Sequence, residues 1–383
     1  MSVPQPLAGR RIGLLSAWAS RLGGGVFEAV VAQARLLAAA GADVQVFALG
    51  DQFSTADAQR FGAVPVQTFA VRGPGQIGYA PKLLGALEQA RLDCLHLHGI
   101  WMYPSLAGSR WAQRSGAGYV VSPHGMLDPW ITARGRWKKA LARSAYERQS
   151  WQRASFLHAL TAREAADIAN ESGRHDSMVI ANPGPLVSAA PLVSRAADLV
   201  YIGRIHPKKN LAALITGWSV AARPADSTLT IAGWGDAVDV AQLQGAVRAA
   251  GPSVRYVGPV YGAAKQALLD SARFTVLTSH SEGLPMAVLE GWAAGTPAIM
   301  TSQCNLPEGF AHGAALQSGY TAETVAPVIA RALMLDEAAW QAMAQAARGL
   351  AAGPFSAETI AARWSAAYLR AIAAKGDRRD RTA

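Results

Sequence analysis

The chain predicts an α/β protein with two doubly wound domains, because apolar strand-like runs alternate with helical stretches in two successive series. The first series begins at residues 11–16, where a strand leads through a glycine loop into a helix expected over 26–40. The second series begins at 199–203. Between them, Asn182-Pro183-Gly184-Pro185 and a loose Ala/Ser/Pro stretch indicate a linker.

The length of the chain supports the same division. With 383 residues it exceeds what one compact core holds, so we expect one domain over 1–185 and another over 195–355. Each is expected to carry a parallel sheet, since that is what alternating strands and helices build. The further expected strands are residues 44–49, 64–69, 94–97, 119–122 and 156–159 in the first domain, and 227–232, 254–257, 274–278 and 298–301 in the second.

Composition describes a packed globular protein, with 51% hydrophobic residues and a mean hydropathy of +0.12. No apolar run reaches the roughly 20 residues of a membrane span, and residues 1–6 lack the features of a signal peptide. The only cysteines, Cys94 and Cys304, match no metal or disulfide spacing, which suits a reducing compartment. We therefore expect a cytoplasmic protein.

The net charge of +10 is concentrated in residues 134–153, where seven Lys or Arg residues are opposed by Glu147 alone. Aromatic residues are interleaved with these cations: Trp130, Trp137, Tyr146 and Trp151. Such a segment can rest on an anionic membrane surface. It can equally be a solvated helix face whose aromatic rings enter the core. No nucleic-acid-binding motif accompanies the charge, so nucleic acid is not an expected partner.

The most informative motif places Glu282 and Glu290 eight positions apart, across a turn that opens a helix. An apolar strand over 272–278 precedes the turn, Gly283 gives it freedom, and Pro285 suits the first helical position. Open α/β sheets bind ligands at the carboxyl ends of their strands, and the amides of a helix start suit a phosphate. Two solvated glutamates in an ordinary strand–turn–helix unit are the alternative.

A basic loop follows the first strand of the second domain. Arg204 and Lys209 lie five positions apart there, so both cations can converge on one anion, for which a diphosphate is the natural candidate. A solvated basic turn is the alternative. In the same domain, Gly233-Trp234-Gly235-Asp236 and the loop around Val257 could hold a flat heterocycle through backbone contacts.

The first domain carries glycine and histidine loops at its expected strand ends. Gly23-Gly24-Gly25 lets backbone approach a ligand, but it is not the G-x-G-x-x-G fingerprint, which argues against a nicotinamide oxidoreductase. His98-Gly99 and His124-Gly125 each follow an apolar strand, where an imidazole could bind a sugar hydroxyl or a phosphate. Asp128 adds a carboxylate that could contact an acceptor.

Taken together, these motifs resemble the retaining glycosyltransferases of family 4. The matching elements run in family order from about residue 12 to residue 310, and the Glu-x7-Glu element with its Glu-Gly-Leu-Pro opening is the most specific. The resemblance implies the GT-B fold: two Rossmann-like domains facing a central cleft, with a C-terminal helix, here about 357–374, crossing back to the first domain. The stretch Pro123–Trp130 looks like a subgroup common in bacterial exopolysaccharide and capsule clusters.

The resemblance also implies residue roles. Arg204 and Lys209 would neutralise the donor diphosphate, Glu282 would contact the donor sugar, and Glu290 would hold the ribose. His124 would contact the sugar or the leaving phosphate. Further donor contacts would come from Gly24 and Gly25, from Gly233 and Val257, and from the backbone amides of Met286, Ala287 and Val288. His98 and Asp128 are the acceptor candidates, and no metal or cofactor is expected.

The implied reaction moves a sugar from a UDP- or GDP-sugar to a glycan or a polyprenyl-diphosphate-linked acceptor. An epimerase acting on sugar nucleotides and a non-catalytic sugar-nucleotide-binding subunit remain as alternatives. Two departures from the family pattern, Asn182-Pro183-Gly184-Pro185 and Gly233-Trp234-Gly235-Asp236, leave the fold prediction intact. They weaken any prediction of hinge behaviour or of the nucleotide base.

Overall fold

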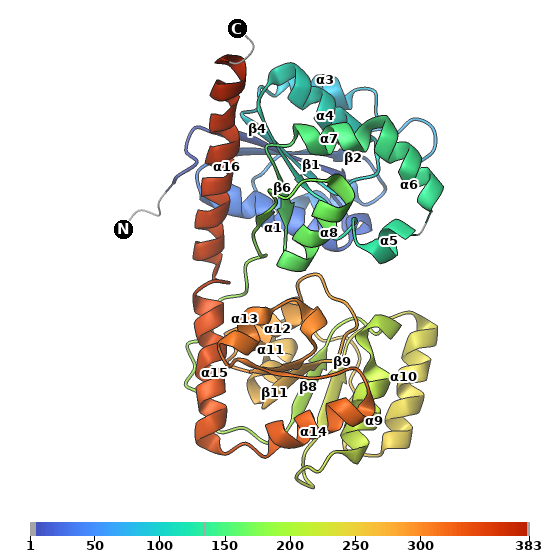
Figure 1. The fold of residues 1–383 in the computed structure, drawn as a ribbon, viewed down its shortest axis with the longest axis vertical. Helices are drawn as coiled ribbons and strands as arrows, with labels where there is room; N and C mark the ends of the chain where they lie inside the picture. Colours follow the sequence, from blue (N-terminus) through green and yellow to red (C-terminus); the bar gives the residue numbers. More distant parts are fainter. Residues whose placement is uncertain (1–4, 134, 381–383) are drawn as a thin grey trace. The chain divides into compact units, whose positions relative to one another are not determined.

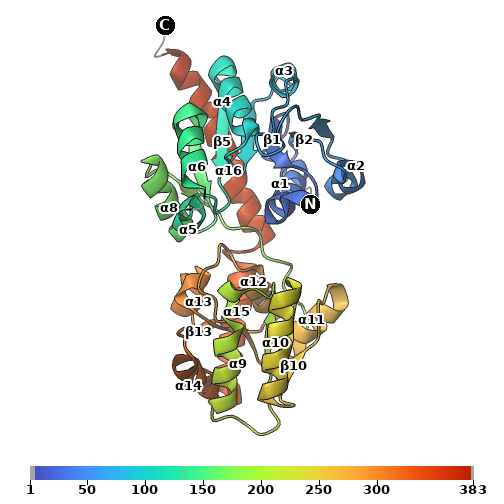
Figure 2. The same ribbon diagram turned by 90° about the vertical axis from the view of Figure 1, so that its right-hand side faces the viewer.

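A computed structural model describes residues 5–133 and 135–380, so Arg134 of the basic segment lies outside the described residues. The chain divides into two compact units (Figures 1 and 2). Unit 1 runs through Asn182 and takes in the C-terminal helix from Ile360 onward, and unit 2 covers Pro183–Thr359.

Unit 1 is built on a parallel sheet of seven strands in the order β3-β2-β1-β4-β5-β6-β7. The strands are β1 (Arg11–Trp18), β2 (Asp43–Leu49), β3 (Val66–Phe69), β4 (Cys94–His98), β5 (Gly118–Ser122), β6 (Phe156–Ala159) and β7 (Met178–Val179). Every residue of β4, β5 and β6 is buried, as expected for central parallel strands covered by helices on both faces.

The helices of unit 1 are α1 (Gly25–Ala39), α2 (Ser54–Asp57), α3 (Leu83–Gln89), α4 (Tyr103–Ser115), α5 (Pro129–Ala133), α6 (Arg136–Ala142), α7 (Arg148–Arg153), α8 (Ala162–Ser172) and α16 (Ala357–Asp380). A π-helical turn, η3 (Arg143–Glu147), joins α6 to α7. Helix α16 packs on the unit 1 sheet, where Trp364 and Tyr368 are buried against β4 and β6 (Figure 1).

Unit 2 has a parallel six-stranded sheet in the order β10-β9-β8-β11-β12-β13. Its strands are β8 (Leu199–Ile202), β9 (Leu229–Ala232), β10 (Val254–Tyr256), β11 (Phe274–Leu277), β12 (Ala298–Met300) and β13 (Ala315–Gln317). Its helices are α9 (Leu211–Val220), α10 (Ala237–Ala250), α11 (Gly262–Ser271), α12 (Met286–Ala293), α13 (Pro307–Ala311), α14 (Ala322–Leu333) and α15 (Glu337–Ala352).

The strand order reverses once in each sheet, between β1 and β4 in unit 1 and between β8 and β11 in unit 2. In open α/β sheets the crevice at the carboxyl ends of such strands is the usual ligand site. The glycine loop follows β1 and His98 is the last residue of β4, while Lys209 and Glu282 follow β8 and β11. The sheet topology therefore places these predicted site residues at the two switch points, while His124, Gly233 and Val257 follow the neighbouring strands β5, β9 and β10.

The predicted fold class is confirmed: both sheets are parallel, with helices on their faces. Strands β7 and β13 were not predicted. The two residues of β7 are too few to give a hydrophobic pattern, and β13 has only two apolar residues, Ala315 and Leu316. Helix α12 starts at Met286, so Pro285 is its N-cap and not its first helical residue.

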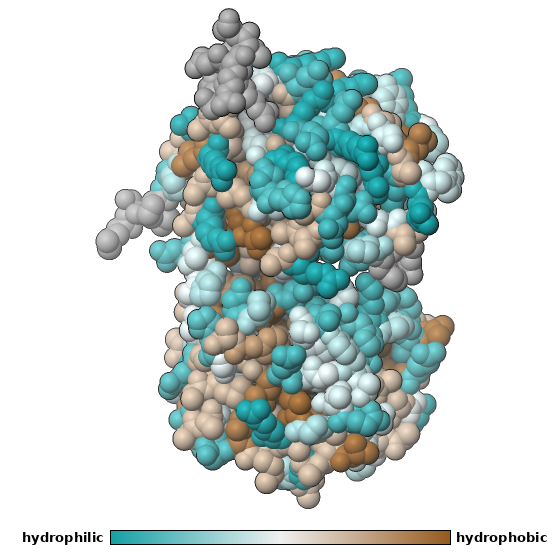
Figure 3. All heavy atoms as spheres, viewed as in Figure 1, coloured by the Kyte–Doolittle hydropathy of each residue, from teal (hydrophilic) through white to brown (hydrophobic). Residues whose placement is uncertain are grey.

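The aromatic residues of the basic segment differ in burial. Trp151 is fully buried, whereas the Trp137 and Leu141 side chains on α6 are 70% and 66% exposed. On the face drawn in Figure 3, hydrophilic residues are mixed with weakly hydrophobic ones, and strongly hydrophobic residues are scattered over it. Among the described residues, no helix combines the length and the apolar character that crossing a membrane requires.

Candidate functional site

The unit 2 switch point brings Lys209 and Glu282 together. Lys209 closes the 3₁₀ turn Pro207–Lys209 after β8, and its Nζ lies 2.5 Å from Glu282 Oε1. The side chains are only 21% and 10% exposed, so this ion pair is partly screened from water. The sequence analysis predicted that Lys209 and Arg204 converge on one anion. In the structure, the direct partner of Lys209 is Glu282.

Hydrogen bonds connect the two loops that carry this pair. His280 N–H donates to the Lys208 carbonyl (2.8 Å), and Thr278 Oγ1 donates to the Lys209 carbonyl (3.3 Å). Glu282 accepts from Ser279 Oγ at the same Oε1 (2.5 Å), and its backbone N–H donates to the Gln303 carbonyl (3.0 Å). The carboxylate is thus held in one orientation before any ligand arrives.

Helix α12 begins four residues after Glu282 and has no side-chain N-cap. The amides of Met286 and Ala287 have no acceptor within the helix, so they can meet an anion, favoured by the helix dipole. Val288 differs from the prediction, because its N–H donates to the Pro285 carbonyl (3.0 Å). Two of the three predicted amides therefore suit a phosphate.

Glu290 lies in the second turn of α12, and its Oε1 accepts from Lys265 Nζ of α11 at 2.7 Å. The sequence analysis did not identify Lys265. No spacing rule could have found it, because α11 and α12 are separate elements whose contact depends on packing. The pair gives this part of unit 2 a second lysine, beside the carboxylate predicted to hold a ribose.

Arg204 is more exposed than Lys209, and its guanidinium lies 3.4 Å from Asp236 Oδ2. The glycines near Asp236 have a packing role. A Cβ on Gly233 would lie 1.7 Å from the Gly203 carbonyl oxygen, and one on Gly235 would lie 2.3 Å from that of Ile205. They allow the loops after β8 and β9 to approach closely.

Val257 directly follows β10. Its N–H donates to the Ile231 carbonyl (3.0 Å), while its side chain is exposed. A ligand at this edge of the sheet would meet an apolar surface there.

In unit 1, Gly24 and Gly25 open helix α1. Gly24 is its N-cap, with a φ of +53° that L side chains rarely adopt, and Gly25 is its first residue. A Cβ on either would meet nothing within 4 Å, so neither is needed for packing. This open helix start at the end of β1 fits the predicted close approach of a ligand.

His98 and His124 form a stacked pair at the ends of β4 and β5. His98 Nδ1 and His124 Nε2 lie 3.0 Å apart, and the ring planes differ by 18°. Burial lowers the pKa of His124 to about 3 and that of His98 well below its ordinary value, with repulsion from neighbouring imidazoles adding to the effect. Both rings are neutral at pH 7, so they can hydrogen-bond hydroxyls but supply no positive charge to a phosphate.

The loop holding His124 is fixed by Glu164, a buried residue of α8 that the sequence analysis missed. Its carboxylate accepts from Gly125 N–H (2.6 Å) and Leu160 N–H (2.8 Å), and burial raises its pKa. Asp128 lies at the end of this loop, where its carbonyl accepts the Ile131 and Thr132 amides of α5.

A buried hydrogen-bonded chain continues from this region through the unit 1 sheet. The Ile180 carbonyl can only accept, so His158 Nε2 carries the proton (2.8 Å) and Ser122 Oγ must donate to His158 Nδ1 (2.7 Å). His96 Nε2 then donates to Ser122 Oγ (2.7 Å), and Tyr368 of α16 donates to His96 Nδ1 (2.6 Å). One carbonyl thus sets the tautomers of two neutral histidines and ties α16 to the sheet.

Chemically, unit 2 offers two lysine–glutamate pairs, an exposed arginine and an open helix start, which are groups that could meet an anion. Unit 1 offers neutral imidazoles and an open glycine loop. Within the described part of the chain, no group of three or more His, Cys, Asp or Glu side chains could hold a metal ion.

Comparison with known proteins agrees with the division of the chain into two units. Residues 24–184 match the family described as glycosyl transferase 4-like domain, and residues 196–350 match glycosyl transferases group 1. The glycogen synthase of Mycobacterium tuberculosis is 29% identical over 318 residues, which cover 77% of this chain and 72% of that protein.

Solved structures with low sequence identity share the fold. Anabaena HepE in complex with UDP and glucose has a TM-score of 0.73 at 18% identity, covering 94% of this chain and 99% of that one. Sucrose-phosphate synthase from Thermosynechococcus elongatus has a TM-score of 0.72 at 18% identity, covering 95% and 100%.

Proposed function

Because the chain belongs to the glycosyl transferases that join a 4-like domain to a group 1 domain, we propose that it transfers a sugar from a nucleoside-diphosphate sugar to an acceptor hydroxyl with retention at the anomeric carbon. Family membership confirms the resemblance seen in the sequence and supports transferase activity. The donor, the stereochemistry and the acceptor are the parts that we propose.

The observation that carries the proposal is the Lys209–Glu282 pair beside the start of α12. Breaking the anomeric C–O bond builds negative charge on the leaving diphosphate, and preorganised positive groups lower that barrier by several kcal/mol. Lys209 is held at the switch point by Glu282, where the Met286 and Ala287 amides can add to its effect. We assign Glu282 the second task of binding the donor sugar, through its carboxylate.

Arg204 is the second cation of this site. Its exposed side chain can leave Asp236 at little cost, because an exposed ion pair contributes only about 0–1 kcal/mol. With Arg204, Lys209 and the α12 dipole supplying positive charge, the proposed departure of the diphosphate is metal-independent.

The nucleotide is assigned to the same unit. Glu290 would bind the ribose hydroxyls, and the loops at Gly233 and Val257 would border the base. HepE was solved with UDP, which supports a UDP-sugar here, while a GDP-sugar remains compatible with these loops.

Retention follows in this proposal from attack on the same face that the diphosphate leaves, through a short-lived ion pair. The neutral His124 ring suits a hydrogen bond to a donor-sugar hydroxyl better than a contact with the leaving phosphate. Gly24 and Gly25 would let the substrates approach the α1 start.

For the acceptor we infer a glycan or a polyprenyl-diphosphate-linked oligosaccharide, used in exopolysaccharide or other cell-surface polysaccharide synthesis. The exposed Trp137 and Leu141 lie one helical turn apart on α6, next to Arg136 and Lys138, with no acidic residue in that helix. This pattern favours peripheral docking on the anionic inner face of the cytoplasmic membrane.

The test is a panel of UDP- and GDP-sugars, measured for binding by calorimetry and for release of nucleoside diphosphate with and without added acceptor. We expect one sugar nucleotide to bind and to turn over, and Lys209→Ala to lose turnover by at least a hundredfold. Arg248→Ala, which removes an exposed cation from α10, is the matched control and should keep full activity.

Other outcomes separate the competing functions. Consumption of the donor without an acceptor would point to an epimerase, and binding without turnover to a non-catalytic subunit. Near-normal turnover of Lys209→Ala would refute the assignment of the leaving-group site.

A further inference from the structure

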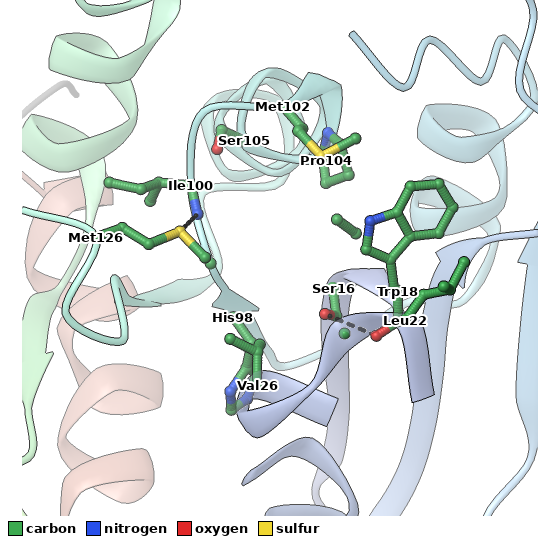
Figure 4. Close-up of a pocket in the computed structure, with 13 residues that line it drawn as sticks. Ser16, Trp18, Leu22, Val26, His98, Ile100, Met102, Pro104, Ser105 and Met126 are labelled. Carbon is green, nitrogen blue, oxygen red and sulfur yellow. Dashed lines mark hydrogen bonds between the residues drawn. The ribbon is translucent and has the colours of Figure 1, made fainter. Parts of the chain in front are cut away.

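The switch points of the two sheets differ in what lies at them. In unit 1, a cavity of about 220 Å³ opens at the carboxyl ends of β1 and β4, and Figure 4 shows the apolar side chains of Trp18, Val26 and Met126 around it. In unit 2, the loop over residues 278–285, which follows β11, lies at the switch point and carries Glu282. A carboxylate that meets a sugar at a defined angle needs its loop to be held in one conformation.

The segment that follows β12 braces this loop by hydrogen bonds. Thr301 Oγ1 donates to the Ser279 carbonyl (2.6 Å). Further along, the Gln303 carbonyl accepts from the Glu282 N–H (3.0 Å), and Asn305 Nδ2 donates to the Glu282 carbonyl (2.5 Å). One short segment therefore holds both backbone polar groups of Glu282.

Asn305 suits its place for two separate reasons. It is the C-cap of the 3₁₀ turn η5 (Ser302–Cys304), with a φ of +57°, a left-handed conformation that asparagine tolerates better than most residues. Its amide nitrogen is the atom that faces Glu282, since a carbonyl oxygen can only accept. Glycine could adopt the same backbone conformation without supplying an amide, so the two roles can be separated by substitution.

The bond from Asn305 acts on the Glu282 carboxylate through the backbone. The Glu282 side chain is only 10% exposed, and its Oε1 is bonded to Lys209 and Ser279. With its N–H and carbonyl bonded as well, the direction in which the side chain leaves the backbone is fixed. Without the Asn305 amide the carbonyl can turn, and a misplacement of about 1 Å can cost about a hundredfold in rate.

We propose that Asn305 is a positioning residue for the donor sugar: its amide fixes the backbone of Glu282 and thereby the direction in which the Glu282 carboxylate meets a sugar hydroxyl. The inference rests on the proposed function, which assigns the donor sugar to Glu282. It adds that the turn after β12 contributes to the preference for a sugar nucleotide over the bare nucleoside diphosphate.

The test separates the amide from the backbone conformation. Asn305→Gly removes the amide and keeps positive φ accessible, whereas Asn305→Asp keeps the shape but sets an acceptor against the Glu282 carbonyl. Each variant is titrated by calorimetry with UDP and UDP-glucose, and with GDP and GDP-mannose. In the pair that binds, we expect Asn305→Gly to weaken the sugar nucleotide about fivefold and Asn305→Asp to weaken it further, while the nucleoside diphosphate changes less than about twofold.

A control variant distinguishes positioning from a general loss of stability. Ser253→Ala removes a hydroxyl that accepts from Trp218 Nε1 (3.1 Å) just before β10, at the opposite end of the sheet from the Glu282 loop. It should lower the melting temperature of unit 2 and leave both affinities unchanged. Hydrogen exchange without ligand should be faster over residues 279–284 in Asn305→Gly and unchanged there in Ser253→Ala.

The inference and the proposed function fail in different measurements. Equal weakening of the sugar nucleotide and its nucleoside diphosphate by Asn305→Gly, or unchanged exchange over residues 279–284, would overturn the positioning role. If the unaltered chain bound none of the four probes, or bound a sugar nucleotide no differently from its nucleoside diphosphate, the donor site of the proposed function would be refuted instead.

Discussion

Acid should destabilise unit 1 because its sheet buries neutral histidines. His96, His98 and His158 are at most 3% exposed, and burial lowers the pKa of His158 to about 4 and those of the other two well below the ordinary 6.5. In the unfolded chain these rings take up protons near pH 6.5, whereas in the folded unit they do not. Their contribution is therefore complete above pH 6.5 and is lost as the pH falls towards the folded pKa.

The size of the effect follows from linkage. Each of these rings is neutral in the folded unit but becomes protonated in the unfolded chain. When the pH is lowered from 7.5 to 5.5, each ring therefore reduces the free energy of unfolding by about 1.4 kcal/mol. The three rings together cost about 4 kcal/mol, and His124 adds a similar single share. Glu147 opposes them, since burial raises its pKa to about 7, and favours folding by about 2 kcal/mol over the same interval.

Glu164 and Asp167, whose pKa values burial also raises, act in the same direction as Glu147. These opposing contributions are the same in the unaltered protein and in a single variant, so they cancel when the stabilities of the two are subtracted at each pH. His158→Gln should lower the stability of unit 1 at pH 7.5, because it disturbs bonds to Ser122 and Ile180. The deficit should shrink by about 1.4 kcal/mol at pH 5.5, since one proton-linked group has been removed.

The assay is urea unfolding at each pH, followed by hydrogen-exchange mass spectrometry of the β4 and β6 peptides, so that unit 1 is read separately from unit 2. His175→Gln changes an exposed histidine of the same unit and should track the unaltered protein at both pH values. A deficit for His158→Gln that stays constant between pH 7.5 and 5.5 would refute the reasoning.

Two further predictions concern the loops of unit 2 and the exposed face of α6. Gly235→Ala should destabilise unit 2 by about 1–3 kcal/mol in thermal unfolding, since its Cβ would lie 2.3 Å from the Ile205 carbonyl oxygen. Gly245→Ala in the interior of α10, where a Cβ meets nothing within 4 Å, should instead stabilise by about 0.5–1 kcal/mol; equal effects of the two would contradict this account. The double variant Trp137→Ser/Leu141→Ser should co-sediment less with anionic vesicles than the unaltered protein does. Val238→Ser, an exposed apolar residue of α10, is the control, and equal binding of neutral and anionic vesicles by the unaltered protein would exclude the membrane hypothesis.

The sequence was sufficient for the fold because the pattern of apolar runs is set by burial. Strands β4 and β5 are buried along their whole length, so apolar residues make up most of their sequences, although His96 and His98 interrupt the pattern of β4. The two-residue β7 leaves no such pattern. The positions of the predicted site residues could also be inferred from the sequence, because the carboxyl ends of parallel strands lie at the same edge of a sheet.

The contacts that the site residues make were harder to predict than their positions in the fold. Lys265 reaches Glu290 from another helix, Glu164 fixes the loop of His124 from 39 positions away, and Lys209 binds Glu282 across 73 positions. Each contact depends on the angle at which one element packs on another, which no local pattern encodes. The buried histidine chain was missed for the same reason, since each histidine is placed by a different strand.

The Lys209–Glu282 pair limits how the proposed donor site can work. A lysine already neutralised by a carboxylate at 2.5 Å attracts a diphosphate less than a lone cation would, so part of the binding energy must come from Arg204 and the α12 amides. Glu282 then keeps Lys209 in place while the site is empty, and its charge is offset again only if it gains hydrogen-bond donors from the sugar. Donor binding should therefore depend on the sugar hydroxyls as well as on the diphosphate, and a free nucleoside diphosphate should leave the pair largely intact.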